Sequence, residues 1–439
     1  MDNNGYSNNN ESYQGEGNNL HPNEPTQETK QTKGIFLLGL LGGVAISTLM
    51  TVFVYVGGRL AGIYSTKNMA PVSTEDAVTE DAFDDTILIK MKTIRDAIDQ
   101  YYYNEDDVDP ENMVDWVYAG MVASLGDPYS AYYTEEEWAD MIEDTKGIYY
   151  GIGAYVSLDV NTGLTRINGV MEGTPAEKAG LRENDLIYLI DGEEITGYEL
   201  SEVVSKMKGE EGTIVHLTIY REGEPDYLEV DVIRGEIESP TVSYEMLEDD
   251  IGYISISEFD DVTVDQFTEA LAVVKGSNAK GLILDLRGNP GGRLAAVVDI
   301  ARQILPEGLI VYTEDKNGKR TEYSCDGKNT LQIPLVVLVN RNSASASEIL
   351  AGAVKDYGIG KLVGMKTFGK GIVQRILPLT DGTALKLTVS AYYTPNGNNI
   401  HNIGIEPDIE CELDTEAYYN DGIDSQLNRA IEEVRKMIG

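Results

Sequence analysis

The chain has 439 residues, enough for two or three domains with substantial cores, and its composition is that of a folded protein. It carries 74 acidic against 34 basic residues, a formal charge of −40. This balance argues against nucleic acid as a partner and against binding anionic lipid through a basic face, and solubility is its simplest consequence.

The first part of the chain predicts a tail followed by a membrane anchor. Residues 1–33 are rich in Asn, Gln, Glu and Ser and have too little apolar content to order themselves. Residues 34–58 contain no charge, and at about 1.5 Å per residue they exceed the ~30 Å hydrocarbon thickness of a bilayer. We therefore expect one transmembrane helix. A cleaved signal peptide is the alternative, disfavoured by the long polar tail and the lack of a small-x-small site.

The flanking charges barely distinguish the two orientations of this helix. An uncleaved export signal normally leaves the amino end in the cytoplasm, so we expect a single-pass protein of the cell membrane whose remainder is extracytoplasmic. Residues 59–80 are typical of a linker. Helical spacing then runs over 84–104 and continues to about 145. This amphipathic region could pack on its own domain or on a partner subunit, which leaves a homodimer open.

Residues from 147 to about 235 alternate short strand patterns with glycine turns. Three stretches, 150–156, 170–181 and 185–192, together resemble a PDZ domain of the circularly permuted kind that accompanies bacterial proteases. The resemblance implies that an extended peptide adds as a strand to a sheet edge, while backbone N–H groups of a turn bind its terminal carboxylate. That turn would consist of Gly151, Ile152, Gly153 and Ala154. Alone, its Gly-x-Gly sequence would indicate only a turn.

From about residue 240, strands alternate with helices, which predicts an α/β core. The expected strands are 252–256, 281–286, 335–339 and 361–365, and the expected helices are 263–276, 293–304, 344–356 and 424–437. A strand, a helix and a strand in this order place parallel strands side by side, with their following loops at one carboxyl edge. Ligands of open α/β sheets bind at that edge.

Two of these loops carry a candidate nucleophile and a candidate base. Ser345 lies in the run Asn-Arg-Asn-Ser-Ala-Ser-Ala-Ser-Glu, and Lys370 lies between two glycines in Thr-Phe-Gly-Lys-Gly. The chain has three histidines; His21 lies in the polar tail and His216 in a strand pattern of the PDZ-like region. A serine nucleophile would therefore need another base. Alone, a lysine flanked by glycines would be a solvated surface turn.

Four motifs in fixed order resemble those of the carboxyl-terminal processing peptidases, serine proteases that use a Ser-Lys dyad. They are Asp-Leu-Arg-Gly-Asn-Pro-Gly-Gly (285–292), Ser-Ala-Ser-Ala-Ser-Glu-Ile-Leu-Ala-Gly (343–352), Phe-Gly-Lys-Gly-Ile-Val-Gln (368–374) and Gly-Ile-Glu-Pro-Asp (404–408). The resemblance covers about residues 84–410. It implies Ser345 as the nucleophile, rather than Ser343 or Ser347, Lys370 as the base and Gln374 as an assisting side chain.

The resemblance also implies a multidomain fold with an α/β protease core of the crotonase-like ββα-spiral type, a mainly β PDZ domain and a helical segment after the transmembrane helix. The expected parts are a cytoplasmic tail 1–33, a transmembrane helix 34–58, a linker 59–80, a helical region 81–146, a PDZ domain 147–236, a protease core 237–412 and a C-terminal helical segment 413–439. The substrates would be proteins or peptides with a free C-terminus.

The expected chemistry sets requirements on the site. Lysine is a base only when neutral, so burial must lower its pKa from about 10.4 toward ~7 to 8. If residues 370–374 run extended, Lys370 and Gln374 point to the same face of the strand. The oxyanion requires donors already aimed at it, for which we expect the N–H of Ala346 and that of Gly291 or Gly292.

No cofactor or metal is expected, because Cys325 and Cys411, the only cysteines, do not have metal-ligand spacing. They could bridge or remain free. Two other functions compete with a protease. One is a non-catalytic adaptor that binds peptide ends, since related folds also serve for binding. The other is a small-ester or lactam hydrolase, but Ser345 lies in neither a Ser-x-x-Lys nor a Gly-x-Ser-x-Gly sequence.

Overall fold

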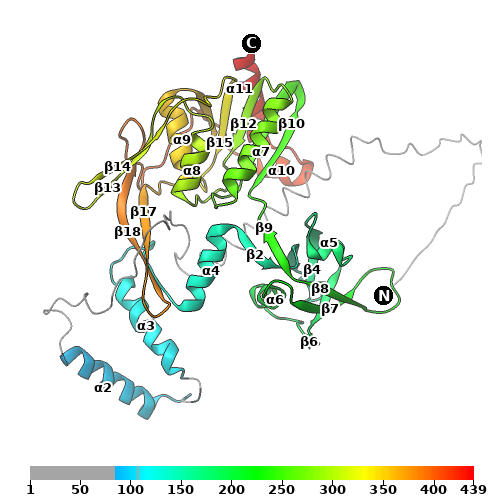
Figure 1. Ribbon diagram of the computed structural model, residues 1–439, viewed down its shortest axis with the longest axis vertical. Helices are drawn as coiled ribbons and strands as arrows, with labels where there is room; N and C mark the ends of the chain where they lie inside the picture. The colour runs from blue at the N-terminus through cyan, green and yellow to red at the C-terminus, as the bar shows by residue number, and fades with distance from the viewer. Residues whose placement is uncertain (1–84, 105, 107) are drawn as a thin grey trace, which may run out of the picture. The chain divides into compact units, whose positions relative to one another are not determined.

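A computed structural model describes residues 85–104, 106 and 108–439 of the chain (Figure 1). The expected tail, the transmembrane helix at 34–58 and the linker at 59–80 lie outside the described residues. Among the helices of the described part, none is both long and apolar enough to cross a membrane.

A six-stranded sheet forms the centre of the C-terminal half. Its strand order is β10 (Val242–Leu247), β11 (Ile251–Ile256), β12 (Gly281–Asp285), β15 (Leu335–Val339), β16 (Gly360–Gly364) and β19 (Ile409–Glu410). β10 is antiparallel to β11, and the remaining neighbours are parallel. The turn η3 (Glu248–Asp250) joins the antiparallel pair. The predicted α/β core is confirmed in its strands and their order along the chain.

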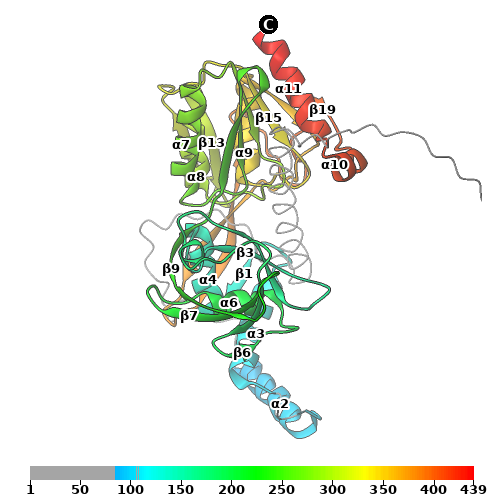
Figure 2. The same cartoon turned by 90° about the vertical axis from the view of Figure 1, so that its right-hand side faces the viewer.

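Helices cover both faces of this sheet because the central strands are apolar on both sides. Leu282 and Leu284 pack into the cluster that includes α7 (Thr263–Gly276), α8 (Leu294–Ala301) and α9 (Ala346–Tyr357). Ile283, between them, packs into the opposite cluster with α11 (Ser425–Ile438). Figure 2 shows α7 and α8 on one side of the sheet and α11 on the other. A short helix, α10 (Thr415–Asp421), precedes α11.

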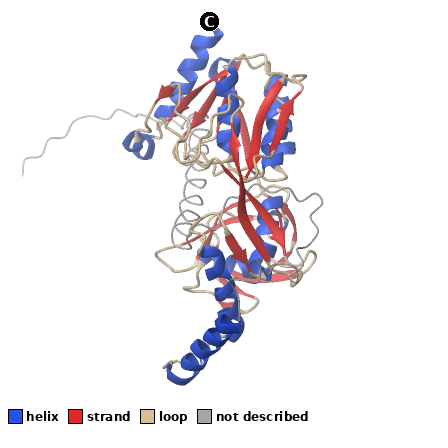
Figure 3. Ribbon diagram, turned by 90° about the vertical axis from the view of Figure 1, so that its left-hand side faces the viewer, coloured by secondary structure: helices blue, strands red, loops and turns tan. Residues whose placement is uncertain are grey.

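A second sheet carries the strand that follows the expected base. Its path is β1 (Ala131–Tyr133), β18 (Ala384–Tyr393), β13 (Gly308–Asp315) and β14 (Arg320–Cys325), and β17 (Ile372–Pro378) also pairs with β18 (Figure 3). Strand β1 comes from the region in which the sequence predicted helical structure up to about 145, and that prediction was wrong over 124–134 and over the described residues between 102 and 109. The chain forms a strand there because β1 pairs with β18, an antiparallel partner that is distant in sequence.

The N-terminal region otherwise consists of helices α2 (Asp85–Tyr101), α3 (Pro110–Ala123) and α4 (Glu135–Lys146). Several large apolar side chains of α2 and α3 are exposed, among them Leu88, Ile89, Trp116 and Met121. A homodimer through these faces stays a prediction.

Residues 148–238 contain the expected PDZ region. One sheet has the order β3 (Ala154–Leu158), β4 (Thr165–Val170), β5 (Leu186–Ile190), β7 (Ile214–Tyr220) and β8 (Leu228–Ile233), with β6 (Glu193–Glu194) beside β5. Helices α5 (Pro175–Lys178) and α6 (Leu200–Met207) contribute to its own apolar core. The pair β2 (Ile148–Gly151) and β9 (Gly235–Glu238) brings the two ends of this region together.

A buried arginine ties α11 to the end of β12. The Arg287 guanidinium binds the carboxylate of Asp285 at 2.6 Å and that of Asp424, the N-cap of α11, at 2.8 Å. It also donates to the Gln426 side chain at 3.1 Å. Because the planar guanidinium satisfies both carboxylates at once, it neutralises two charges that are largely removed from water.

We predict that Arg287→Met destabilises the protein by about 3–5 kcal/mol, because it leaves two uncompensated carboxylates in a poorly hydrated place. Urea unfolding monitored by circular dichroism measures the change. The matched control is Lys280→Met, which removes a cation from the exposed pair with Asp250 and should leave the stability nearly unchanged. Equal effects of the two substitutions would contradict the anchoring role of Arg287.

Candidate active site

Ser345 lies at the N-cap of α9, between strand β15 and that helix, as the sequence predicted. Its backbone has φ 54° and ψ −113°, a conformation that non-glycine residues rarely adopt and that costs ~1–3 kcal/mol. The side chain is buried, and its Oγ has no hydrogen-bond partner in the part of the chain that the structure describes. The hydroxyl is therefore not hydrogen-bonded to Lys370 in this arrangement.

A buried carboxylate nevertheless brings the two residues together. One oxygen of Glu348 accepts the backbone N–H of Ser345 at 2.9 Å and that of Lys370 at 2.8 Å. Its other oxygen accepts the Gly369 N–H at 2.7 Å and the Thr367 hydroxyl at 2.6 Å. Ser345 and Lys370 are thus neighbours in space, as the convergence of their loops predicted.

Glu348 was not singled out from the sequence, although a signal was present. It lies three residues after Ser345, the spacing at which a glutamate at the third helical position binds the N-cap backbone. Burial raises the pKa of this carboxyl group, whereas the four hydrogen bonds that it accepts act in the opposite direction. The structure thus adds a residue that positions both members of the expected dyad.

Lys370 is one of the largest fully buried side chains of the described residues, with 2% of its surface exposed. Burial, followed by the nearby positive charge of Lys386, lowers the pKa of Lys370 to about 7, while Asp127 and Glu348 oppose this shift. Its Nζ lies over the ring of Tyr129, 4.7 Å from the centroid. This direction of shift brings the uncharged amine within reach of neutral pH, which is the first requirement for a lysine base.

Gln374 is buried on β17, which begins at Ile372. Val373 lies opposite Ser390 and Gln374 opposite Thr388, so the bulged residue is Val389 on β18 and β17 keeps its alternation. Lys370 lies two residues before this strand and is buried like Gln374, and the expectation that the two side chains share a face stays a prediction. The Gln374 side chain donates to the Thr388 hydroxyl at 3.2 Å, while its Oε1 is buried without a partner among the described residues.

The expected oxyanion donors lie near Ser345, but one of them is already engaged. Gly291 has φ 111°, and a Cβ there would lie 2.7 Å from the Ser345 Cβ and 3.0 Å from the Ala346 nitrogen. Its N–H donates to the Asn289 side chain at 2.8 Å. For the Gly292 N–H, the described residues provide no hydrogen-bond acceptor. Ala346 lies in the first turn of α9, where N–H groups have no acceptor within the helix.

The turn expected to bind a carboxylate joins β2 to β3. Gly153 has φ 78°, and its carbonyl accepts the Met171 N–H at 3.1 Å and the Thr174 hydroxyl at 3.1 Å. Ile152 is buried, and its carbonyl accepts the Ala176 N–H at 2.7 Å. Hydrogen bonds to the carbonyl groups of Ile152 and Gly153 therefore hold this turn in place.

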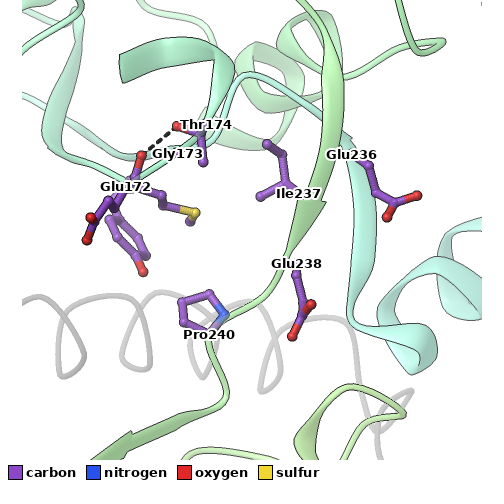
Figure 4. A pocket seen from close by; sticks show the side chains of 9 residues that line it. Glu172, Gly173, Thr174, Glu236, Ile237, Glu238 and Pro240 are labelled. Atoms are coloured by element: carbon purple, nitrogen blue, oxygen red, sulfur yellow. Dashed lines mark hydrogen bonds between the residues drawn. The ribbon is translucent and has the colours of Figure 1, made fainter. Parts of the chain in front are cut away.

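A pocket of about 400 Å³ lies next to this turn (Figure 4). It is lined by Tyr155, Met171, Glu172, Gly173, Thr174, Glu236, Ile237, Glu238 and Pro240. The Thr174 hydroxyl that holds Gly153 therefore belongs to a residue of the pocket wall. Three of the lining residues are glutamates, so the pocket presents an apolar interior with negative charge around it.

The third histidine was not weighed from the sequence, yet it lies beside the expected base. A Cβ at Gly371 would lie 2.6 Å from the backbone nitrogen of His401. The Nδ1 of the His401 ring is buried without a hydrogen-bond partner among the described residues. His216 instead lies on β7 and contacts Asp231 at 2.6 Å. Cys325 and Cys411 are both free thiols, and no cluster of metal-ligating side chains occurs among residues 85–104, 106 and 108–439.

The sequence was compared with known proteins. Residues 250–411 match the model of peptidase family S41, residues 166–221 that of a PDZ domain, and residues 48–137 that of the N-terminal domain of the activating protease CtpB. The chain is similar to a carboxy-terminal-processing protease of Bartonella bacilliformis, with 38% identity over 310 residues, 69% of this chain and 70% of the relative.

Two further relatives agree with these matches. A carboxyl-terminal-processing protease of Synechocystis is 37% identical over 320 residues, 71% of this chain and 74% of its own. The carboxy-terminal processing protease CtpB of Bacillus subtilis is 35% identical over 360 residues, 81% of this chain and 74% of its own. The chain therefore belongs to peptidase family S41, the carboxyl-terminal processing serine proteases, and carries a PDZ domain.

Proposed function

We propose that the chain is a membrane-anchored endopeptidase that recognises the C-terminal tail of a protein through its PDZ domain and cuts peptide bonds with a Ser345-Lys370 dyad. One observation carries the dyad: a single carboxylate oxygen of Glu348 accepts the backbone N–H of both residues. The lowered pKa of the buried Lys370 amine is consistent with its role as a base.

The chemistry follows from the two side chains. The neutral amine of Lys370 takes the proton of the Ser345 hydroxyl as Oγ attacks the carbonyl carbon of the scissile bond. The ammonium then gives this proton to the departing amine, which leaves an acyl-enzyme. Water, deprotonated by the same amine, attacks the ester carbon and releases the acid and the free serine. The N–H groups of Ala346 and Gly292 are the donors proposed for the oxyanion.

The Ser345 hydroxyl has no hydrogen-bond partner among the described residues, so substrate binding must complete its bond to Lys370. Hydrogen bonds between catalytic groups are often long in unliganded enzymes and tighten when the substrate binds. Gln374 fits the role of an assistant, because its unpartnered Oε1 can accept from the ammonium without adding a charge. A peptide-binding adaptor remains the second candidate, and it requires no such bond.

We predict that Ser345→Ala and Lys370→Met each lower cleavage of a protein with a flexible tail at least about 10³-fold, because each removes one half of the dyad. Cleavage by the full chain is followed by gel electrophoresis and mass spectrometry. The control is His401→Gln, which changes the histidine beside the Lys370 loop and should retain activity within about tenfold. An active Lys370→Met variant, or loss of activity in His401→Gln alone, would identify a different base.

The PDZ domain supports recognition of a free carboxyl end by the N–H groups of residues 151–154. We predict that amidation of the substrate's C-terminus lowers kcat/KM by about 10- to 100-fold, because it removes a charge-assisted hydrogen bond of ~1.5–3 kcal/mol. Two peptides that differ only in this group provide the measurement. Equal rates would remove carboxylate binding from the proposal and leave the protease itself intact.

The charge-free segment 34–58 supports a single membrane anchor, and an uncleaved export signal normally leaves the amino end in the cytoplasm. We predict that the full chain sediments with membranes and resists extraction by carbonate, whereas a chain starting at residue 59 is released. A protease added outside intact cells should digest the folded part. A full chain in the soluble fraction, or one protected from the external protease, would contradict this placement.

A further inference from the structure

A turn from the N-terminal region lies against the expected base. Tyr129, in the turn Asp127–Ser130, places its ring under the Lys370 Nζ at 4.7 Å from the centroid. The Asp127 carboxylate shapes the turn by accepting the Tyr129 N–H at 3.0 Å and the Ser130 hydroxyl at 2.6 Å. None of these residues belongs to the dyad or to the motifs around it.

The protease sheet fixes the turn in place. Strand β1 follows it directly and pairs with β18, with Ala131 opposite Lys386. The Ser130 Oγ accepts the backbone N–H of Thr388, 258 residues further along the chain, at 3.1 Å. The hydroxyl of Thr388 in turn accepts from the Gln374 amide at 3.2 Å. Hydrogen bonds through Thr388 therefore connect the turn to the proposed assistant Gln374, and the Tyr129 ring contacts the base.

Charged groups of both signs face the Lys370 amine from the elements packed around it. Negative charge comes from Asp127 in the turn and from Glu348 on α9, and positive charge comes from Lys386 on β18. Lys386 is itself buried, with its Nζ 5.4 Å from the centroid of the Tyr133 ring on β1. The turn thus brings the Asp127 carboxylate and the Tyr129 ring to Lys370, and strand β1 brings the Tyr133 ring to Lys386.

We propose that the Asp127–Ser130 turn is a positioning element of the active site, in which Tyr129 holds the Lys370 amine, Asp127 favours its protonated form and Lys386 opposes that form. The proposal rests on the role of Lys370 as the base. Its consequence is that a segment outside the protease core shifts the pH below which kcat/KM falls.

The direction of each effect follows from charge. A neighbouring carboxylate stabilises the ammonium form, so its removal lowers the pKa of Lys370; a neighbouring ammonium destabilises that form, so its removal raises the pKa. The acid limb of kcat/KM reports the base of the free enzyme. Asp127→Asn should therefore extend activity to lower pH, and Lys386→Met should restrict it to higher pH.

The test uses the full chain with Ser345→Ala, so that the titration of Lys370 is measured without turnover. The readout is the NMR signal of the Lys370 side chain in protein labelled with ¹³C at lysine Cε, assigned by its loss in Lys370→Met. We expect Asp127→Asn to lower the pKa by on the order of one unit and Lys386→Met to raise it by a similar amount. Asparagine keeps an oxygen that can accept the Tyr129 N–H, so the turn should persist.

Matched controls separate charge from structure. Asp115→Asn removes a carboxylate of the same region that binds the Tyr132 hydroxyl at 2.9 Å, and it should leave the titration unchanged. Tyr129→Phe, which keeps the ring, should titrate like the parent protein, whereas Tyr129→Leu should shift the pKa downward.

The acid limbs are then measured with Ser345 restored. Acid limbs of kcat/KM that shift in the same direction as the pKa of Lys370 support the proposal. Unchanged titrations in both Asp127→Asn and Lys386→Met would overturn the role of the turn, whatever the activity. Titrations that shift without the acid limbs would instead show that Lys370 is not the base.

Discussion

The arrangement of the site depends on one buried carboxylate. Glu348 is fully buried and accepts hydrogen bonds from Ser345, Thr367, Gly369 and Lys370. Burying an unpaired carboxylate would cost several kcal/mol, and four donors together with the N-terminal end of α9 offset that cost. The same bonds fix the 367–370 loop against the helix, so the fold places the proposed nucleophile and the proposed base next to each other.

The fixed loop directs the Lys370 side chain into the protein interior, where burial destabilises the charged form of the amine. The protein as a whole is strongly acidic, and at long range its negative field favours protonated lysines. Solvent ions screen that field beyond about 10 Å, whereas desolvation acts at the amine itself. The local environment therefore prevails, and the balance among Asp127, Glu348 and Lys386 adjusts a pKa that burial has already lowered.

The sequence predicted the parts of the fold that depend on local pattern. The strand at 335–339 and the helix at 263–276 are found at the predicted positions because long apolar runs and helical periodicity are local signals. Strand β1 was missed because it has only three residues and is stabilised by pairing with β18, and the bulge at Val389 on β18 has no sequence signature. Glu348 was recognisable from its spacing to Ser345, whereas the position of Tyr129 over Lys370 is purely tertiary.

The central claim is that Lys370 loses its charge near neutral pH because it is buried, and stability measures this directly. A lysine whose pKa falls from 10.5 to about 7 on folding destabilises the protein fully below pH 7, and the penalty vanishes as the pH rises toward 10.5. The free energy of unfolding should therefore be higher in Lys370→Met than in the parent by on the order of a few kcal/mol at pH 6.5, and this gain should shrink markedly by pH 9.5. A gain that is the same at both pH values, or that grows with pH, would show that Lys370 stays charged in the folded protein.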